Sequence, residues 1–272
     1  MKRLIVLLLL TGKMAWPQSE TGSVTFFFMS GGEITMSADS KAISVQTREA
    51  KSDCKISAFG DKFAFQIAGF IKDDIPNGWD VRLIARKIWQ SESLHEPDAF
   101  RLVQAVSDKW MDRTRGIYSD PEYISYRRRT HPNSPFIANV VFAATDKSGQ
   151  LIARAVDVSF DMAVFDSAGR VDLGYRPRYQ SPGWIAAGSG EIINEFMLGV
   201  SPRAKKFMND WRANNAKLTP SSRNAELARK MIEFSIRLHP HPEEIGPPVD
   251  VLQIMPKTGI HWVQGEARCA AQ

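Results

Sequence analysis

The sequence has little of several features that would identify a function at once. Its 272 residues include only two cysteines, Cys54 and Cys269. Two cysteines cannot form a disulfide framework, and their spacing matches no zinc motif. The 35 basic residues only slightly outnumber the 30 acidic ones, which does not indicate a nucleic-acid partner. No apolar run exceeds seven residues, so we expect no membrane anchor.

The surroundings of the two cysteines differ. Cys54 lies in an apolar stretch that predicts a core strand, whereas Cys269 lies in a polar tail. An exported chain permits a disulfide between them, but these surroundings favour two separate thiols. His239 and His241 are close in sequence, yet prolines follow both of them and no third ligand has a suitable spacing. We therefore expect neither a metal nor another cofactor.

The N-terminus has the order of a secretory signal peptide. Two basic residues precede the apolar run Leu4–Leu10, and a turn-prone polar stretch follows it. Gly12 or Ala15 could precede the cleavage site. The sequence therefore predicts an exported protein, periplasmic or extracellular, and a propeptide or a buried N-terminal strand is the alternative. Cleavage at Ala15 leaves several residues ahead of Thr21, so a free amine there needs a second cut.

Length and composition favour one domain with long loops. A chain of this length with 43% hydrophobic residues can bury a large core. We assign residues 1–20 to a signal peptide or propeptide, residues 21–264 to the domain and residues 265–272 to a flexible tail. The basic and aromatic stretch at residues 113–135 favours a solvated loop over a binding patch for RNA or an anionic surface.

The strongest pattern begins at residue 21 and ends at Gly69. The apolar run Val24–Met29 is followed by Ser30-Gly31-Gly32 and by a second run, Glu33–Ala38. This order predicts a β-hairpin. The first strand is apolar on both faces, with Phe26 on one and Phe27 on the other, so it should be a central strand covered on both sides.

Chemically active side chains gather around this hairpin in the sequence. Thr21, Ser23 and Thr25 alternate along the start of the first strand, so their hydroxyls share one face. Asp39 ends the second strand, and Lys55 follows in an apolar setting. An N-terminal Ser or Thr can act as a nucleophile with its own amine as the base, and a desolvated lysine beside a carboxylate tunes the proton transfers.

These residues resemble the start of a proteasome-type subunit of the N-terminal-nucleophile hydrolases. That family has a hydroxyl-led strand, a second strand ending in Ala-Asp-Ser-Arg, then a lysine and a glycine. This chain has Ala38-Asp39-Ser40-Lys41, Lys55 and Gly69, and the separations of sixteen and fourteen positions match the family. The resemblance implies that Lys55, held by Asp39, assists the nucleophile and that a backbone amide near Gly69 binds the oxyanion.

A second segment adds to the resemblance, and a third departs from it. Gly188-Ser189-Gly190 is similar to the Gly-Ser-Gly of these subunits, whose serine supports the amine of the nucleophile. The local pattern also fits a tight strand-to-helix turn capped by Ser189. Near the C-terminus the family has an Asp, a Ser and glycines, but residues 241–246 of this chain lack the Asp and the Ser.

The identity of the nucleophile depends on the register of the hairpin. A hairpin of the family's usual length puts the catalytic position at Ser23. A hairpin that is one residue longer puts Gly22 there, which supplies no nucleophilic side chain, and one that is two residues longer puts Thr21 there. Gly31 and Gly32 permit each register. The three alternatives remain open from the sequence.

The order of the expected elements indicates an α+β fold. Strands, two helices, strands, further helices and a last strand pair predict a four-layer αββα sandwich of two mostly antiparallel sheets, as the resemblance also implies. The implied function is hydrolysis of a peptide or amide substrate, and a homo-oligomer is one expected assembly. The alternative is a non-catalytic subunit or binding module with the same fold. Helices are expected near residues 81–88, 98–110, 192–197, 204–211 and 224–238.

Overall fold

The computed structural model describes most of the expected domain. It covers residues 20–21, 23–44, 49–72, 79–96, 98–121, 123–125, 136–165, 171–180, 182–240 and 244–269. The expected signal peptide up to residue 19, the arginine-rich residues 127–129 and His241 lie outside the described residues. The described chain mixes helices with three antiparallel sheets.

The hairpin is central in the first of two five-stranded sheets. Its strands are β2 (Val24–Ser30) and β3 (Glu33–Asp39). The order in this sheet is β11-β2-β3-β12-β13, and all neighbours are antiparallel. The other strands are β11 (Gly183–Gly188), β12 (Val249–Met255) and β13 (Gly259–Gln264). The prediction of a central hairpin is therefore confirmed.

The second five-stranded sheet has the order β10-β9-β8-β7-β6. Its strands are β6 (Ile56–Phe59), β7 (Phe63–Gly69), β8 (Phe136–Thr145), β9 (Leu151–Phe165) and β10 (Val171–Tyr179). The sequence did not predict β10, because glycine and proline interrupt it. Since β10 is an edge strand, its free side tolerates a residue without an N–H group.

A third, small sheet lies beyond the end of the hairpin. It has the order β1-β4-β5, with β1 (Glu20–Thr21), β4 (Lys41–Ser44) and β5 (Ala50–Ser52). The chain passes from β3 into β4 through Ser40, and from β5 toward β6 through residues 53–55. Residues 53–55 therefore connect the small sheet to one of the large sheets.

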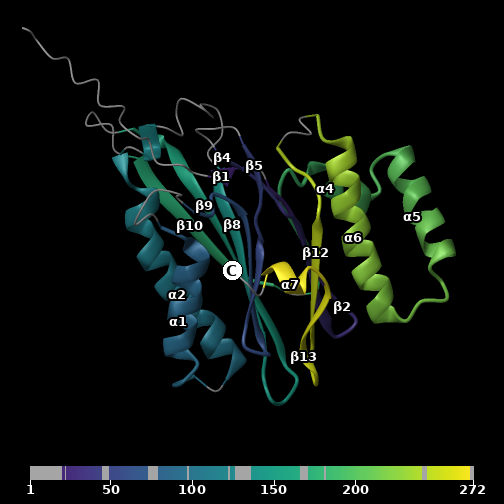
Figure 1. Cartoon of the computed structure of the whole chain (residues 1–272), viewed down its shortest axis with the longest axis horizontal. Coiled ribbons are helices and arrows are strands. Elements are labelled where there is room, and N and C mark those ends of the chain that lie inside the picture. Colours follow the sequence, from purple (N-terminus) through teal and green to yellow (C-terminus); the bar gives the residue numbers. More distant parts are fainter. Residues whose placement is uncertain are drawn as a thin grey trace, which may run out of the picture.

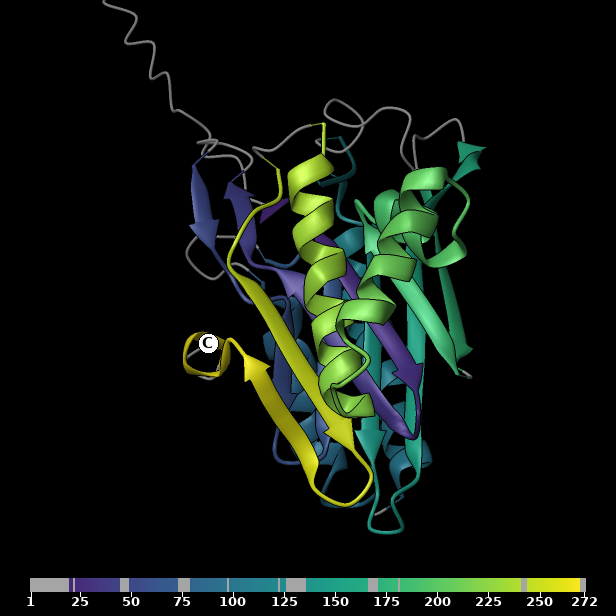
Figure 2. The ribbon, with the colours of Figure 1, turned by 90° about the vertical axis from the view of Figure 1, so that its right-hand side faces the viewer.

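Helices cover the outer face of each large sheet (Figure 1). On one side α1 (Val81–Glu92) and α2 (Ala99–Tyr118) pack on the sheet of β6 to β10, and Asp80 and Asp98 cap their N-termini. On the other side α4 (Glu191–Leu198), α5 (Pro202–Asn214) and α6 (Pro220–Leu238) cover the sheet that contains the hairpin. A short helix, α7 (Glu266–Cys269), follows β13 at one sheet edge (Figure 2).

Three apolar clusters explain why the layers stay together. Phe26 points into the cluster between its sheet and α4 to α6, whereas its neighbour Phe27 points into the cluster between the two sheets. Phe65 and Trp110 belong to the third cluster, beneath α1 and α2. Burial of such side chains contributes about 1.5–3 kcal/mol each. The two apolar faces of the first strand thus correspond to two packed interfaces, and the chain is an α+β sandwich.

One expectation about the C-terminus is wrong. Cys54 and Cys269 form a disulfide and are not separate thiols. Cys269 is only 3% exposed, because α7 turns back against the edge of the sandwich. Local polarity misled the sequence interpretation, since a short polar helix can bury one side chain while its other residues face solvent.

The turn of the hairpin allows a direct test of its geometry. Gly31 and Gly32 have φ values of 64° and 77°, which suit a tight two-residue turn. Gly32→Ala should lower the free energy of unfolding by about 1–2 kcal/mol, because a side chain strains this conformation. Gly116→Ala, at an exposed position inside α2 with no atom near the added carbon, should raise it by about 0.5–1 kcal/mol. Urea denaturation of both variants measures the difference, and equal effects would contradict the turn.

Candidate active site at the ends of the two sheets

The hairpin register places the start of β2 beside Asp39. Ser30 pairs with Glu33 across the two-glycine turn, and the ladder continues to Thr25 opposite Ala38. The backbone N–H of Val24 donates to Asp39 Oδ1 at 2.7 Å. Ser23 is the residue immediately before this contact. Of the three positions considered from the sequence, Ser23 is the one that this register brings to the strand start.

Asp39 and Lys55 form a fully buried ion pair between the two large sheets. Lys55 Nζ lies 2.6 Å from Asp39 Oδ1, and both side chains are 0% exposed. Lys55 Nζ also donates to the backbone oxygen of Lys41 at 2.7 Å. Asp39 ends β3 in one sheet, and Lys55 directly precedes β6 in the other. The pairing expected from the sixteen-residue spacing is therefore present.

Backbone amides hold the second oxygen of Asp39. Asp39 Oδ2 accepts from the N–H of Lys41 at 3.3 Å and from the N–H of Gly246 at 3.2 Å. Gly246 lies in the segment before β12 where the sequence lacks the Asp and Ser of the family. Sequence reasoning missed this contact because a backbone donor has no side-chain signature. A carbon added to Gly246 would lie 2.8 Å from Lys41 Cδ, so a side chain would crowd the contact.

Burial controls the protonation of both members of the pair. Burial lowers the pKa of Lys55, and the charge and hydrogen bond of Asp39 oppose that shift. Burial also raises the pKa of Asp39, against the effects of Lys55 and of the amides of Val24 and Gly246. The two shifts bring the proton affinities of the groups closer together. Shifts of this kind, produced by burial and a specific charged partner, are typical of functional sites.

Ser23 is held next to the backbone amide of Gly69. Ser23 is 4% exposed, and its Oγ accepts from the Gly69 N–H at 3.3 Å. Gly69 has a φ value of 111°, and a carbon added there would lie 2.2 Å from the backbone oxygen of Ile137. Glycine is therefore required at the end of β7. The family resemblance assigns oxyanion binding to the Gly69 N–H, and this N–H points at the hydroxyl of Ser23.

Ser189 approaches the strand start through its backbone. The Ser189 N–H donates to the backbone oxygen of Ser23 at 2.8 Å. Gly188 pairs with Val24, and a carbon added to Gly188 would lie 2.0 Å from the Ser23 oxygen. The N-cap of α4 is Gly190 and makes no side-chain cap bond, so the interpretation of Ser189 as a helix cap is wrong. The tight approach of two backbones explains the small residues of this turn.

Thr21, the other hydroxyl candidate, lies in the small sheet. It belongs to β1 and pairs with Ile43 of β4. Its side chain lies outside the described residues, as does Gly22. The described structure thus brings Ser23, Asp39, Lys55 and Gly69 together and places the backbone of Ser189 beside them.

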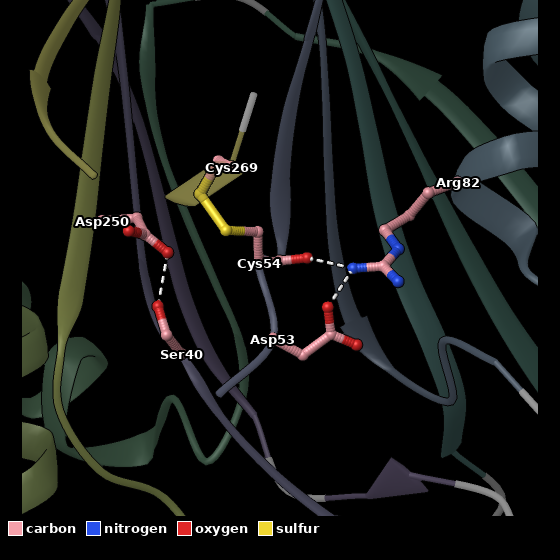
Figure 3. Close-up of a disulfide and its surroundings, with 6 residues drawn as sticks. All are labelled: Ser40, Asp53, Cys54, Arg82, Asp250 and Cys269. Atoms are coloured by element: carbon pink, nitrogen blue, oxygen red, sulfur yellow. Dashed lines mark hydrogen bonds and ion pairs between the residues drawn. A yellow bond between two sulfur atoms is a disulfide. The ribbon is translucent and has the colours of Figure 1, made fainter. Parts of the chain in front are cut away.

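A second group of polar side chains lies near this site. Ligand atoms of Cys54, Asp250 and Cys269 all lie within 4.8 Å of one another, and all three residues are buried. Both sulfur atoms are joined in the disulfide, so they are not thiolates that would bind a metal. Asp250 instead accepts a hydrogen bond from Ser40, the residue after Asp39 (Figure 3).

The fold and site define an α+β sandwich with a buried Lys–Asp pair beside a strand-start serine. No family model matches the chain, and no curated protein matches its sequence. Within the described residues, no helix is long and apolar enough to cross a membrane. The chemical interpretation of the site therefore depends on its residues and their geometry.

Proposed function

We propose that the chain is a proteasome-type N-terminal-nucleophile amide hydrolase, most simply a peptidase, with Ser23 as its nucleophile. One observation carries this proposal. The hydroxyl of Ser23, the Gly69 amide that donates to it and the Asp39–Lys55 pair lie at the same end of the two sheets. The nucleophile, the oxyanion donor and the charged pair that this chemistry needs therefore occur together.

The proposed reaction begins when the peptide bond before Ser23 is cut. The freed α-amine takes the proton of Ser23 Oγ as this oxygen attacks the substrate carbonyl carbon. The Gly69 N–H stabilises the negative charge on the carbonyl oxygen. The bond to the leaving amine then breaks, the amine receives the proton, and water hydrolyses the remaining ester. Lys55 adds positive charge near the serine oxygen, and Asp39 holds Lys55 in place.

The arrangement of layers supports the same family. Two antiparallel sheets lie between two layers of helices, as an N-terminal-nucleophile hydrolase requires. The Cys54–Cys269 disulfide favours the exported location that the N-terminal sequence predicts, because reducing compartments rarely keep such bonds. The proposed substrate is a peptide or a related amide, and the proposed assembly is a homo-oligomer.

A non-catalytic subunit or binding module is the second candidate. Two observations favour it. Residues 241–246 lack the Asp and Ser of the family, and Ser189 contacts Ser23 through a backbone amide. In this alternative the Asp39–Lys55 pair only fastens the two sheets together.

The processed N-terminus separates the two candidates. Protein recovered from the medium or periplasm should begin at Ser23, because only a chain cut there has a free amine on the nucleophile. Intact-mass measurement and N-terminal sequencing give the position. A reagent that reacts with N-terminal hydroxyls should then modify Ser23 in the wild type and not in Lys55→Met. A mature chain that begins at neither Ser23 nor Thr21, or a wild type that the reagent leaves unmodified, supports the non-catalytic candidate.

A further inference from the structure

The backbone just before Lys55 lies outside the strand ladders. Residues 53–55 lie between β5 and β6 and belong to no strand. Two backbone hydrogen bonds hold them, from Asp53 N–H to the oxygen of Ser40 at 2.7 Å and from Ile67 N–H to the oxygen of Lys55 at 2.9 Å. Fixing the long side chain of Lys55 costs rotational entropy, and a mobile backbone at this point would add to that cost. Contacts other than the strand ladders must therefore hold the backbone next to Lys55.

A disulfide and an arginine supply those contacts (Figure 3). Cys54 is bonded to Cys269 of α7, which lies 215 positions further along the chain. Arg82 of α1 donates through Nη1 to the backbone oxygen of Cys54 at 2.6 Å and contacts the carboxylate of Asp53. A salt bridge of 2.6 Å to Asp80 fixes the other end of the guanidinium group.

These two anchors reach the same point from different parts of the fold. Arg82 is largely buried, and its helix, α1, packs on the sheet that contains β6. The disulfide joins Cys54 to the C-terminal helix α7. This helix follows β13, which belongs to the sheet that contains the hairpin. Cys54, between them, is 1% exposed. The residue next to Lys55 is thus fixed to elements on both sides of the sandwich.

We propose that the Cys54–Cys269 disulfide, together with Arg82, positions Lys55 for the reaction, so that the C-terminal segment is a working part of the site. This inference rests on the proposed function. Displacement of a catalytic group by about 1 Å can reduce a rate roughly a hundredfold. The disulfide holds Cys54 and thereby keeps the Lys55 ammonium beside Asp39. Arg82 and both cysteines are positioning residues, since they act through Lys55.

The test compares the oxidised wild type with the double variant Cys54→Ala, Cys269→Ala in the full processed chain. The rate constant for reaction of Ser23 with an N-terminal-hydroxyl reagent should fall by roughly ten- to a hundredfold, while the concentration of half-saturation stays unchanged. Val103→Ala is the control. It truncates a buried side chain of α2 in the apolar cluster between the helices and the sheet of β6 to β10. It should therefore lower the melting temperature without slowing the reaction.

A second measurement does not depend on activity. Lys55 of the wild type and of Val103→Ala should resist an amine-acylating reagent, because it is buried against Asp39. In the double variant, peptide mass spectrometry should show acylation of Lys55 at least about tenfold faster. Equal acylation, or measurable reaction at Ser23 with equal rates in the wild type and the double variant, would overturn the positioning role. A wild type that fails to react at Ser23 while the acylation still differs would refute the proposed function and leave the positioning of Lys55 intact.

Discussion

Replacement of Ser23 by alanine is expected to lower the rate of amide hydrolysis by roughly 10⁴-fold or more, the usual effect of losing a nucleophile. The reason is local. The Gly69 N–H points at the Ser23 hydroxyl, so this oxygen lies beside the donor that the proposed reaction assigns to the oxyanion. The free energy of unfolding should fall by only about 1–3 kcal/mol, because the Gly69 N–H loses its acceptor. Steady-state hydrolysis of a peptide amide and thermal denaturation measure the two effects.

Two further variants make this expectation specific. Ser23→Thr keeps the hydroxyl and should retain activity. Thr21→Ala should leave the rate near that of the wild type, because Thr21 pairs with Ile43 in the small sheet and is removed when the chain is cut before Ser23. If the cut before Ser23 is self-catalysed, Ser23→Ala should also accumulate as an unprocessed chain. Loss of activity in Thr21→Ala together with an active Ser23→Ala would assign the nucleophile to Thr21.

Much of the fold could be predicted because apolar periodicity reports burial. Phe26 and Phe27 alternate across β2, and each enters a different core cluster. The edge strand β10 was missed because Gly174 and Pro177 break the strand pattern, although Pro177 still aligns with Val156. An edge strand needs hydrogen bonds on one side only, so tertiary pairing outweighs local propensity here.

The sequence predicted the ionisable side chains of the site and missed the contacts that depend on which distant segments meet. Asp39 and Lys55 could be found because a carboxylate and a lone lysine in apolar surroundings are conspicuous, and their pairing is observed. The amide of Gly246 and the disulfide could not be found in this way. Both depend on which segments meet in three dimensions, and a short local pattern does not encode that meeting. The sequence of the two-glycine turn allowed three registers of the hairpin. The strand pairing in the structure identifies the one that forms.

Breaking the buried ion pair is expected to have the largest effect on stability. Lys55→Met should leave the carboxylate of Asp39 buried without its cation, and Asp39→Asn should leave the ammonium of Lys55 without its anion. Each change should lower the free energy of unfolding by roughly 3–5 kcal/mol. The double variant, Asp39→Asn with Lys55→Met, contains no buried charge at this point and should recover at least half of the summed loss. Denaturant titrations of the four proteins close the cycle.

The same four proteins distinguish chemistry from packing, because activity should not recover with stability. All three variants should be inactive if Lys55 serves the reaction, whereas an active double variant would make the pair purely structural. The pH dependence of Lys55→Met provides a further check. Removal of Lys55 removes the largest interactions that oppose the burial-raised pKa of Asp39, and the amides of Val24 and Gly246 still lower it. The folded variant then binds a proton more tightly than the unfolded chain, so its stability falls as pH rises from the ordinary carboxyl range through the raised pKa. Its deficit should therefore be smallest in acid and largest at neutral pH, and a deficit that is independent of pH would mean that Asp39 is not left as a buried, unpaired carboxylate.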